Sequence, residues 1–278
     1  MNNARRLSLP DALAQCLLAQ EPVDKVALTH ALWAAWKQGR VAVCEQDARA
    51  GIALPGRPAT PALVSPLLVP RRRLGSREGR AAMIHAITHI EFNAINLALD
   101  AAHRFAGMPV EYYADWLRVA AEEATHFGLL VQHLASLGYS YGDFAAHDGL
   151  WEMAMKTTHD PLVRMALVPR VLEARGLDAT PAITRKLQKI GDVRAVEILA
   201  IIERDEIGHV AVGSRWFAYL CGQRGLEPAA TFRQLLNEYD IPPPRLPINI
   251  EGRRQGGFSE IELEWLSAPA LSQAQRRG

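Results

Sequence analysis

The chain has 278 residues, 49% of them hydrophobic, and a formal net charge of +1. This length can bury a substantial core, and the balanced charge provides no long-range attraction to nucleic acid or to an anionic membrane. The three cysteines, Cys16, Cys44 and Cys221, are too few and too far apart for a disulfide framework or a zinc ribbon. The sequence has no signal peptide and no run of about 18 apolar residues, so we expect a cytoplasmic protein that does not cross a membrane.

Residues 1–78 are expected to form N-terminal helices followed by a proline-rich arm. Apolar residues recur at helical spacing within 8–50, where a segment from about Asp24 to Gln38 ends at Gly39. Five prolines then fall within 51–78, and that density blocks a regular helix. The sequence predicts an extended arm laid over the surface of the domain.

Residues 79–221 carry the longest helical pattern in the chain. We expect four main helices at about 77–106, 110–137, 160–190 and 192–221. A long connection, 139–159, joins the second to the third and contains a short helix near Leu150–Lys156. A short link, a long crossover and a second short link are typical of ferritin-like bundles. The sequence therefore predicts an all-α protein built on a ferritin-like four-helix bundle.

The third helix and the C-terminal region are less regular. Pro169 is expected to kink the third helix, and Thr180-Pro181 to break and restart it. Residues 222–278 are expected to form a strap that packs on the bundle. It contains a polyproline stretch from Ile241 and a helix near Ser259–Leu266.

Two Glu-x-x-His motifs lie far apart in the chain, and a lone glutamate precedes each by a similar distance. Glu91 comes 32 residues before Glu123, and Glu173 comes 33 residues before Glu206. This order of residues matches the ligands of a helical bundle that holds two metal ions. The candidate metal ligands are Glu91, Glu123, His126, Glu173, Glu206 and His209.

Each of these glutamates lies on an apolar stripe of its helix, which predicts that the carboxylates point into the core. A buried, unpaired carboxylate costs several kcal/mol, so it must be protonated, paired with a cation or bound to metal. Arg170 and Arg175 are the only basic residues near Glu173, and the other three stripes carry no lysine or arginine. Two divalent cations would balance four carboxylates. The alternative is a metal-free bundle whose core polar groups satisfy one another.

Spacing also suggests roles for the ligands. We expect Glu123 and Glu206 to bridge the two ions, and Glu91 and Glu173 each to bind one of them. His126 and His209 would each complete the coordination of one ion. Mixed carboxylate and imidazole ligation suits two iron ions, with manganese or a mixed manganese–iron pair as the alternatives.

Acidic residues directly before two ligands suggest supporting roles. Glu122 precedes Glu123, and Asp205 precedes Glu206. Ligand histidines commonly donate their second N–H to a carboxylate. We therefore expect Asp205 to support His126, and Glu122 to support His209. An ordinary surface acid is the alternative, and it is stronger for Glu122.

Two further histidines and one glutamate lie close to the motifs. His85 and His89 are four residues apart but lack the intervening glutamate of a zinc-protease motif, and they point away from Glu91 on a helical wheel. We expect them to lie on the helix surface or to support the ligands rather than to bind metal. Glu203, one turn before Glu206, is an alternative ligand.

At these residues the chain resembles the ferritin-like superfamily, whose diiron carboxylate members use this ligand order. It is similar in particular to a bacterial family known as domain of unknown function 455. The similarity spans about residues 5–268 and matches all six ligand positions. It is carried by the segments Val69–Arg72, Leu74–Ser76, His85–Glu91, Pro169–Asp178 and Asp205–Val210. A more distant resemblance, to the tRNA hydroxylase that acts on a modified adenosine, suggests monooxygenase chemistry by analogy of fold.

The resemblance and the ligand pattern together favour an oxidoreductase. Two ferrous ions would react with dioxygen and hydroxylate or desaturate a small or tRNA-borne substrate, held in an apolar pocket near Phe92 and Phe127. An external reductase would supply the electrons. The alternatives are a non-catalytic protein, in which the metal is handled or holds the helices together, and a protein whose arms bind a partner. The sequence does not predict the oligomeric state.

Overall fold

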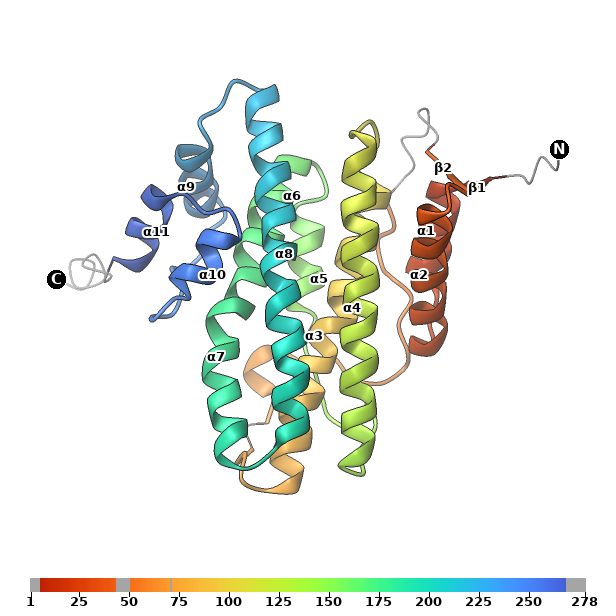
Figure 1. The fold of residues 1–278 in the computed structure, drawn as a ribbon, viewed down its shortest axis with the longest axis vertical. Coiled ribbons are helices and arrows are strands. Elements are labelled where there is room, and N and C mark those ends of the chain that lie inside the picture. The colour runs from red at the N-terminus through yellow and green to blue at the C-terminus, as the bar shows by residue number, and fades with distance from the viewer. Residues whose placement is uncertain (1–5, 44–50, 71, 269–278) are drawn as a thin grey trace. The chain divides into compact units, whose positions relative to one another are not determined.

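The computed structural model describes residues 6–43, 51–70 and 72–268, and helices make up most of them (Figure 1). Cys44 and Arg71 lie outside the described residues. The chain divides into two compact units, Met1–His159 with Asp192–Ile198, and Asp160–Gly191 with Leu199–Gly278. The all-α class is confirmed, whereas the assembly of the long helices into one ferritin-like bundle stays a prediction. Within the described ranges, no helix combines the length and the apolar character needed to cross a membrane.

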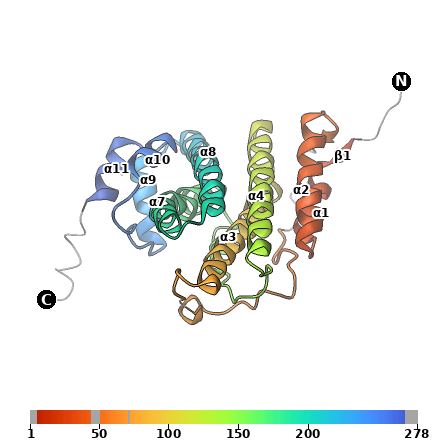
Figure 2. The same cartoon turned by 60° about the horizontal axis from the view of Figure 1, so that its bottom comes forward.

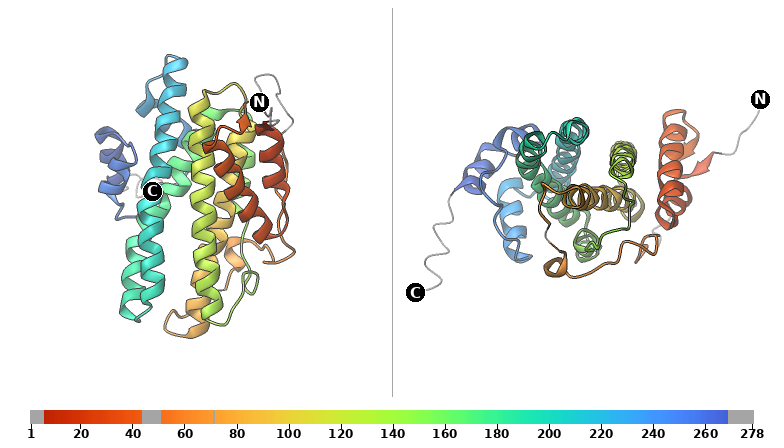
Figure 3. Two further views of the ribbon diagram at one scale, coloured as in Figure 1. Left: turned by 45° about the vertical axis from the view of Figure 1, so that its right-hand side comes forward. Right: turned by 90° about the horizontal axis from the view of Figure 1, so that it is seen from below.

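The first unit begins with two antiparallel helices, α1 (Leu9–Leu18) and α2 (Pro22–Lys37), drawn in red in Figure 3. Two short parallel strands, β1 (Leu7–Ser8) and β2 (Val41–Ala42), pair beside them. The buried Lys25 of α2 donates hydrogen bonds to the carbonyls of Cys16 and Leu17, at 2.9 and 2.8 Å. These carbonyls are in the last turn of α1, where a cation is favourable. Lys25 thus joins the C-terminal end of α1 to α2.

Residues 51–70 form no α-helix, as their prolines predicted, and contain only a 3₁₀ turn, η1 (Pro66–Leu68). Backbone hydrogen bonds fix this segment to other parts of the first unit. Gly56 N–H donates to the Leu17 carbonyl at 2.7 Å, and Val64 N–H donates to the Ala146 carbonyl at 2.8 Å. The arm is therefore joined to α1 and to the connection after the second long helix.

Two long helices, α3 (Arg77–Arg104) and α4 (Val110–Ser136), run side by side in the first unit (Figures 1 and 2). Ser76 caps α3 by accepting a hydrogen bond from Gly79 N–H at 3.0 Å. The link between the helices includes Gly107, whose φ of +74° suits a residue without a side chain. A short helix, α5 (Gly149–Lys156), lies in the connection that follows. These bounds agree with the sequence-based ones to within two residues.

The second unit begins with α6 (Pro161–Leu167), which passes through a π-helical segment, η2 (Val168–Glu173), into α7 (Ala174–Lys189). The distortion expected at Pro169 therefore takes the form of a π-helical segment, which ends at the candidate ligand Glu173. Such segments inside α-helices are frequent at functional sites.

The expected break at Pro181 was wrong, because α7 continues through this residue. Proline has no N–H, so the carbonyl four residues earlier, that of Leu177, loses its helical partner. The side chain of Asn249 donates a hydrogen bond to this carbonyl at 3.3 Å. Thr180 does not cap a new helix and instead donates to the carbonyl of Gly176 at 2.9 Å. A contact from a distant part of the sequence thus compensates for the proline.

The chain continues through α8 (Val193–Gln223), α9 (Pro228–Glu238), α10 (Ile250–Gln255) and α11 (Glu260–Ser267). Helix α11 was expected, and Ser259 and Glu262 form a capping box at its start. The sequence interpretation missed α9 and α10. Glu227 accepts hydrogen bonds from two N–H groups of α9, and Pro228 occupies its first turn, so this start signal was present in the sequence.

Within the second unit, Gly213 of α8 lies against Pro169. A Cβ atom at Gly213 would approach Pro169 Cγ to 2.3 Å. We expect Gly213→Ala to lower the free energy of unfolding by about 1–3 kcal/mol through this overlap. Gly128 of α4 has no atom within 4 Å of its ideal Cβ position, so Gly128→Ala should stabilise by up to about 1 kcal/mol. Urea unfolding measures both changes in the free energy of unfolding. Equal effects of the two substitutions would contradict the close approach of Gly213 to Pro169.

Candidate metal centre

The first unit contains a buried cluster of two carboxylates and one imidazole. Glu91 comes from α3, and Glu123 and His126 come from α4, one turn apart. Their exposed fractions are 3%, 0% and 1%. His126 Nδ1 lies 3.2 Å from Glu91 Oε2 and 3.3 Å from Glu123 Oε2, and the candidate ligand atoms lie within 4.8 Å of one another. This set of oxygen and nitrogen donors fits a metal ion such as iron or manganese.

Burial and mutual charge change the proton affinity of this cluster. Burial raises the pKa of Glu91 well above its ordinary value, and the charge of Glu123 raises it further. Burial alone would lower the pKa of His126, but hydrogen bonds to Glu123 and Glu91 and the charges of both outweigh it and raise this pKa to about 11. Without a metal, the cluster therefore retains protons, which a bound divalent cation would displace.

Three aromatic rings of the first unit pack against one another, and two of them belong to residues that follow a candidate ligand in the sequence. Phe92 follows Glu91, Phe127 follows His126, and the ring of Tyr141 lies 5.6 Å from that of Phe92 and 5.2 Å from that of Phe127. The cavity next to Phe92 has a volume of about 10 Å³, which is room for a single water molecule. His89 and Tyr141 also line this cavity, but no candidate ligand does, so the apolar substrate pocket expected near Phe92 and Phe127 stays a prediction.

His85 and His89 are buried, so the expected position on the helix surface was wrong. Burial lowers the pKa of each to about 4. His85 Nε2 accepts a hydrogen bond from Gly142 N–H at 2.9 Å, and His89 Nδ1 lies 2.8 Å from the Tyr141 hydroxyl. Both histidines therefore fix the connection that follows α4, and neither contributes to the cluster.

The depressed pKa of His85 predicts loss of stability in acid. The folded value of about 4 lies below the ordinary value of 6.5, so between these limits the unfolded chain binds the proton more tightly. The contribution of His85 to the free energy of unfolding is complete above pH 6.5 and falls as the pH falls toward 4. At pH 5 the loss is about 2 kcal/mol.

The test compares urea unfolding at pH 7.5 and at pH 5, with a chelator present so that metal does not contribute. We expect His85→Gln, which keeps an acceptor for Gly142, to lose about 2 kcal/mol less than the unaltered protein over this interval. The exposed His147, replaced in the same way, controls for the substitution. An unchanged pH dependence in His85→Gln would contradict the prediction.

The second unit carries the other three candidate ligands. Glu206 and His209 lie one turn apart on α8, are both buried, and have 3.5 Å between Glu206 Oε1 and His209 Nδ1. Glu173 is half-buried at the end of η2. Each unit therefore supplies one glutamate and one Glu-x-x-His pair, and the joining of the two sets stays a prediction. The alternative ligand Glu203 is half-buried on the same helix.

Arg170, a candidate cation for Glu173, has other partners. Its Nη2 donates to Glu262 Oε1 at 2.7 Å, and its Nε donates to Ser214 Oγ at 3.1 Å. The guanidinium lies near the rings of Phe217, Phe232 and Phe258. The charge of Arg170 is thus balanced by Glu262.

The supporting roles of Glu122 and Asp205 stay predictions. Glu122 is partly exposed and accepts hydrogen bonds from Arg118, one turn earlier on α4, at 2.9 and 3.0 Å. Asp205 pairs with the neighbouring Arg204 at 2.8 Å. These contacts fit surface acids as well as residues that hold a ligand.

Comparison with known proteins assigns a family. The family described as "Protein of unknown function (DUF455)" matches residues 18–264. The chain belongs to this family. A relative described as an uncharacterized protein of Haemophilus influenzae is 54% identical over 216 residues, which cover 75% of each chain. No solved structure matches the sequence. The resemblance to DUF455 is thereby confirmed, and membership of the ferritin-like superfamily stays a prediction.

Sequence reasoning missed two residues of this DUF455 protein that contact His89 of α3. Tyr141 packs on both phenylalanines and contacts His89. Asn93 lies one turn from His89, and its amide nitrogen is 3.0 Å from His89 Nε2. Asn93 lies four residues after His89 on α3, and this spacing, which puts the two side chains on one face of the helix, could have drawn attention to it. Tyr141 lies in irregular chain, where spacing gives no indication of direction.

Proposed function

We propose that the chain is a ferritin-like protein that binds two metal ions, with iron as the first candidate and manganese or a mixed pair as alternatives. Glu91, Glu123 and His126 would provide one half of the ligand set. Glu173, Glu206 and His209 would provide the other. The observation that carries the proposal is the buried cluster of two carboxylates and an imidazole within 4.8 Å. Its donor types suit these metals, and a divalent charge would compensate the buried carboxylates.

The repetition of the motif supports the contribution of both units. A second buried Glu-x-x-His pair, Glu206 with His209, has the same spacing as the first, and a glutamate at the end of a π-helical segment precedes it. Four carboxylates balance two divalent ions, whereas the cluster of the first unit alone balances one. This charge balance favours two ions over one.

For the activity, we propose an oxygen-dependent oxidoreductase with an external electron donor and a small or tRNA-borne substrate. If the six ligands hold two iron ions, the ions would supply electrons for the reduction of dioxygen, and the external donor would restore them.

A second candidate is a protein that binds metal without transforming an organic substrate. The buried cluster supports it equally, because the same ligands would hold a metal ion whether or not a reaction follows. The two candidate functions share the metal site and differ in whether the protein accelerates the reaction of bound iron with oxygen.

The test is to load the protein with Fe(II) without oxygen and then to add oxygen. An oxidoreductase should consume oxygen and oxidise its iron at least tenfold faster than the same iron in buffer, and Glu123→Gln should abolish this acceleration. Bound iron that oxidises no faster than free iron would reject the oxidoreductase and leave the non-catalytic metal protein. Absence of bound iron or manganese would reject both.

A further inference from the structure

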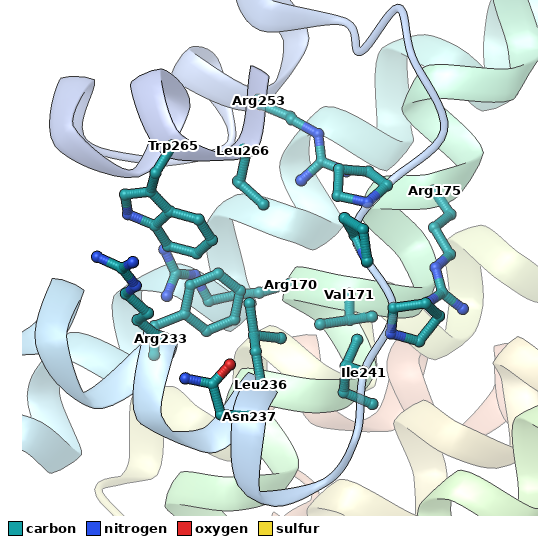
Figure 4. A pocket seen from close by; sticks show the side chains of 14 residues that line it. Arg170, Val171, Arg175, Arg233, Leu236, Asn237, Ile241, Arg253, Trp265 and Leu266 are labelled. Carbon is teal, nitrogen blue, oxygen red and sulfur yellow. The ribbon is translucent and has the colours of Figure 1, made fainter. Parts of the chain in front are cut away.

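A pocket of about 180 Å³ lies in the second unit (Figure 4). Its walls come from η2 and α7, from α9, from residues 241–244 and from the ends of α10 and α11. An apolar cavity of about 150 Å³ can hold a benzene molecule. The pocket therefore has room for a single ring with a small attached group.

Arginines surround this pocket and exceed the nearby acids in number. Arg170, Arg175, Arg233 and Arg253 line it. Arg170 pairs with Glu262, and Arg253 pairs with Asp178, each at 2.7 Å. Among the described residues, Arg175 and Arg233 form no ion pair. In Figure 4 they reach the pocket from opposite sides, so two positive charges at its edge remain to be balanced.

Arg170 adds an unused hydrogen-bond donor. Its side chain is buried, with 3% of its surface exposed, and its Nη1 has no hydrogen-bond partner. This enclosed donor adds to the excess of positive charge and hydrogen-bond donors beside the pocket.

The remaining walls are flat and apolar. Phe232 and Trp265 present aromatic rings, 5.9 Å apart between centroids, and Pro242, Pro243 and Pro244 form part of the opposite wall. Rings and prolines suit a planar body, whereas the guanidinium groups suit a carboxylate, which accepts two parallel hydrogen bonds from an arginine.

We propose that this pocket binds a small organic carboxylate with a single-ring apolar body. Arg175 and Arg233 attract the carboxylate from the two sides of the pocket, and Phe232 and Trp265 contact the ring. The site is independent of the proposed metal centre, because none of its contacts requires a metal. It goes beyond the proposed function by assigning a ligand class to the second unit.

The test is calorimetric titration of the metal-free full chain with benzoate. Benzamide has the same shape without the charge, and inorganic phosphate has charge without the ring. We expect benzoate to bind at least tenfold more tightly than either. Arg175→Gln and Arg233→Gln should each weaken benzoate binding about tenfold. Arg185→Gln, an exposed arginine of α7 outside the pocket, should leave it unchanged.

Three outcomes would overturn the proposal. They are no detectable heat with benzoate, equal binding of benzoate and benzamide, and equal effects of Arg185→Gln and the two pocket substitutions. Both pocket arginines are exposed on helices, so circular dichroism should show an unchanged fold in each variant. Because all titrations use metal-free protein, failure here does not bear on the metal site.

Discussion

Protein purified without a chelator should contain two metal ions per chain, and Glu123→Gln should lose them. Glutamine keeps the size of the side chain but removes the charge and one ligand oxygen from a fully buried position. We expect the affinity for Fe(II) or Mn(II) to fall at least about 100-fold, beyond the 10–100-fold typical of residues that only support a ligand. Elemental analysis after gel filtration gives the metal content.

Graded substitutions separate ligands from supporting residues. Glu122→Gln and Asp205→Asn should reduce affinity by about 10–100-fold if these acids hold the ligand histidines. Glu197 is an exposed acid of α8 that pairs with Arg194, and Glu197→Gln should retain both ions. Retention of two ions by Glu123→Gln would contradict the site. So would a metal-free protein whose thermal stability is unchanged by added iron or manganese.

The same measurement tests whether both units contribute to the centre. If the two sets of three ligands meet, Glu206→Gln should lower the metal content as strongly as Glu123→Gln does. If Glu123→Gln removes a single ion and Glu206→Gln removes none, the cluster of the first unit binds one ion alone. The second result would reject the dinuclear proposal while preserving the role of Glu91, Glu123 and His126.

Helical periodicity explains why much of the fold and three ligands could be predicted. A carboxylate on an apolar stripe must face the core of its helix pair, so Glu91, Glu123 and His126 were predicted to be buried together before their positions were known. The same periodicity predicted the bounds of α3 and α4 to within two residues. The joining of these ligands to Glu173, Glu206 and His209 depends on how two units meet, which local spacing does not determine.

Other features depended on contacts that local sequence does not record. Pro181 remains inside α7 because the side chain of Asn249 bonds the carbonyl that the proline leaves without a partner. Tyr141 closes the space beside Phe92 from an irregular connection. Helix α9 had a start signal at Glu227 and Pro228, but its 11 residues follow irregular chain and precede a run of prolines. Contacts between distant parts of the sequence and the shortness of some helices therefore account for the wrong and missing predictions.

Removal of Glu262 should be among the most destabilising single substitutions in the second unit. Arg170 is buried, and Glu262, which is 3% exposed, balances its charge at 2.7 Å. Removing one partner of a buried pair leaves the other charge uncompensated, at a cost of about 3–5 kcal/mol. Burial also lowers the pKa of Arg170, but an arginine is too basic to escape this cost by losing its proton near neutral pH. We expect Glu262→Leu to lower the free energy of unfolding by that amount in urea at pH 7.

Two further variants isolate the cause, because Glu262 also belongs to the capping box of α11. Ser259→Ala removes the cap alone and should cost about 1 kcal/mol. Arg170→Met combined with Glu262→Leu removes both charges and should recover most of the stability lost in Glu262→Leu, because well-packed apolar side chains often replace a buried ion pair without loss. Two results would contradict this explanation: a cost of Glu262→Leu no larger than that of Ser259→Ala, or no recovery of stability in the double substitution. In either case the uncompensated charge of Arg170 would not be the cause. The rings of Phe217, Phe232 and Phe258 would then have to stabilise Arg170 by themselves.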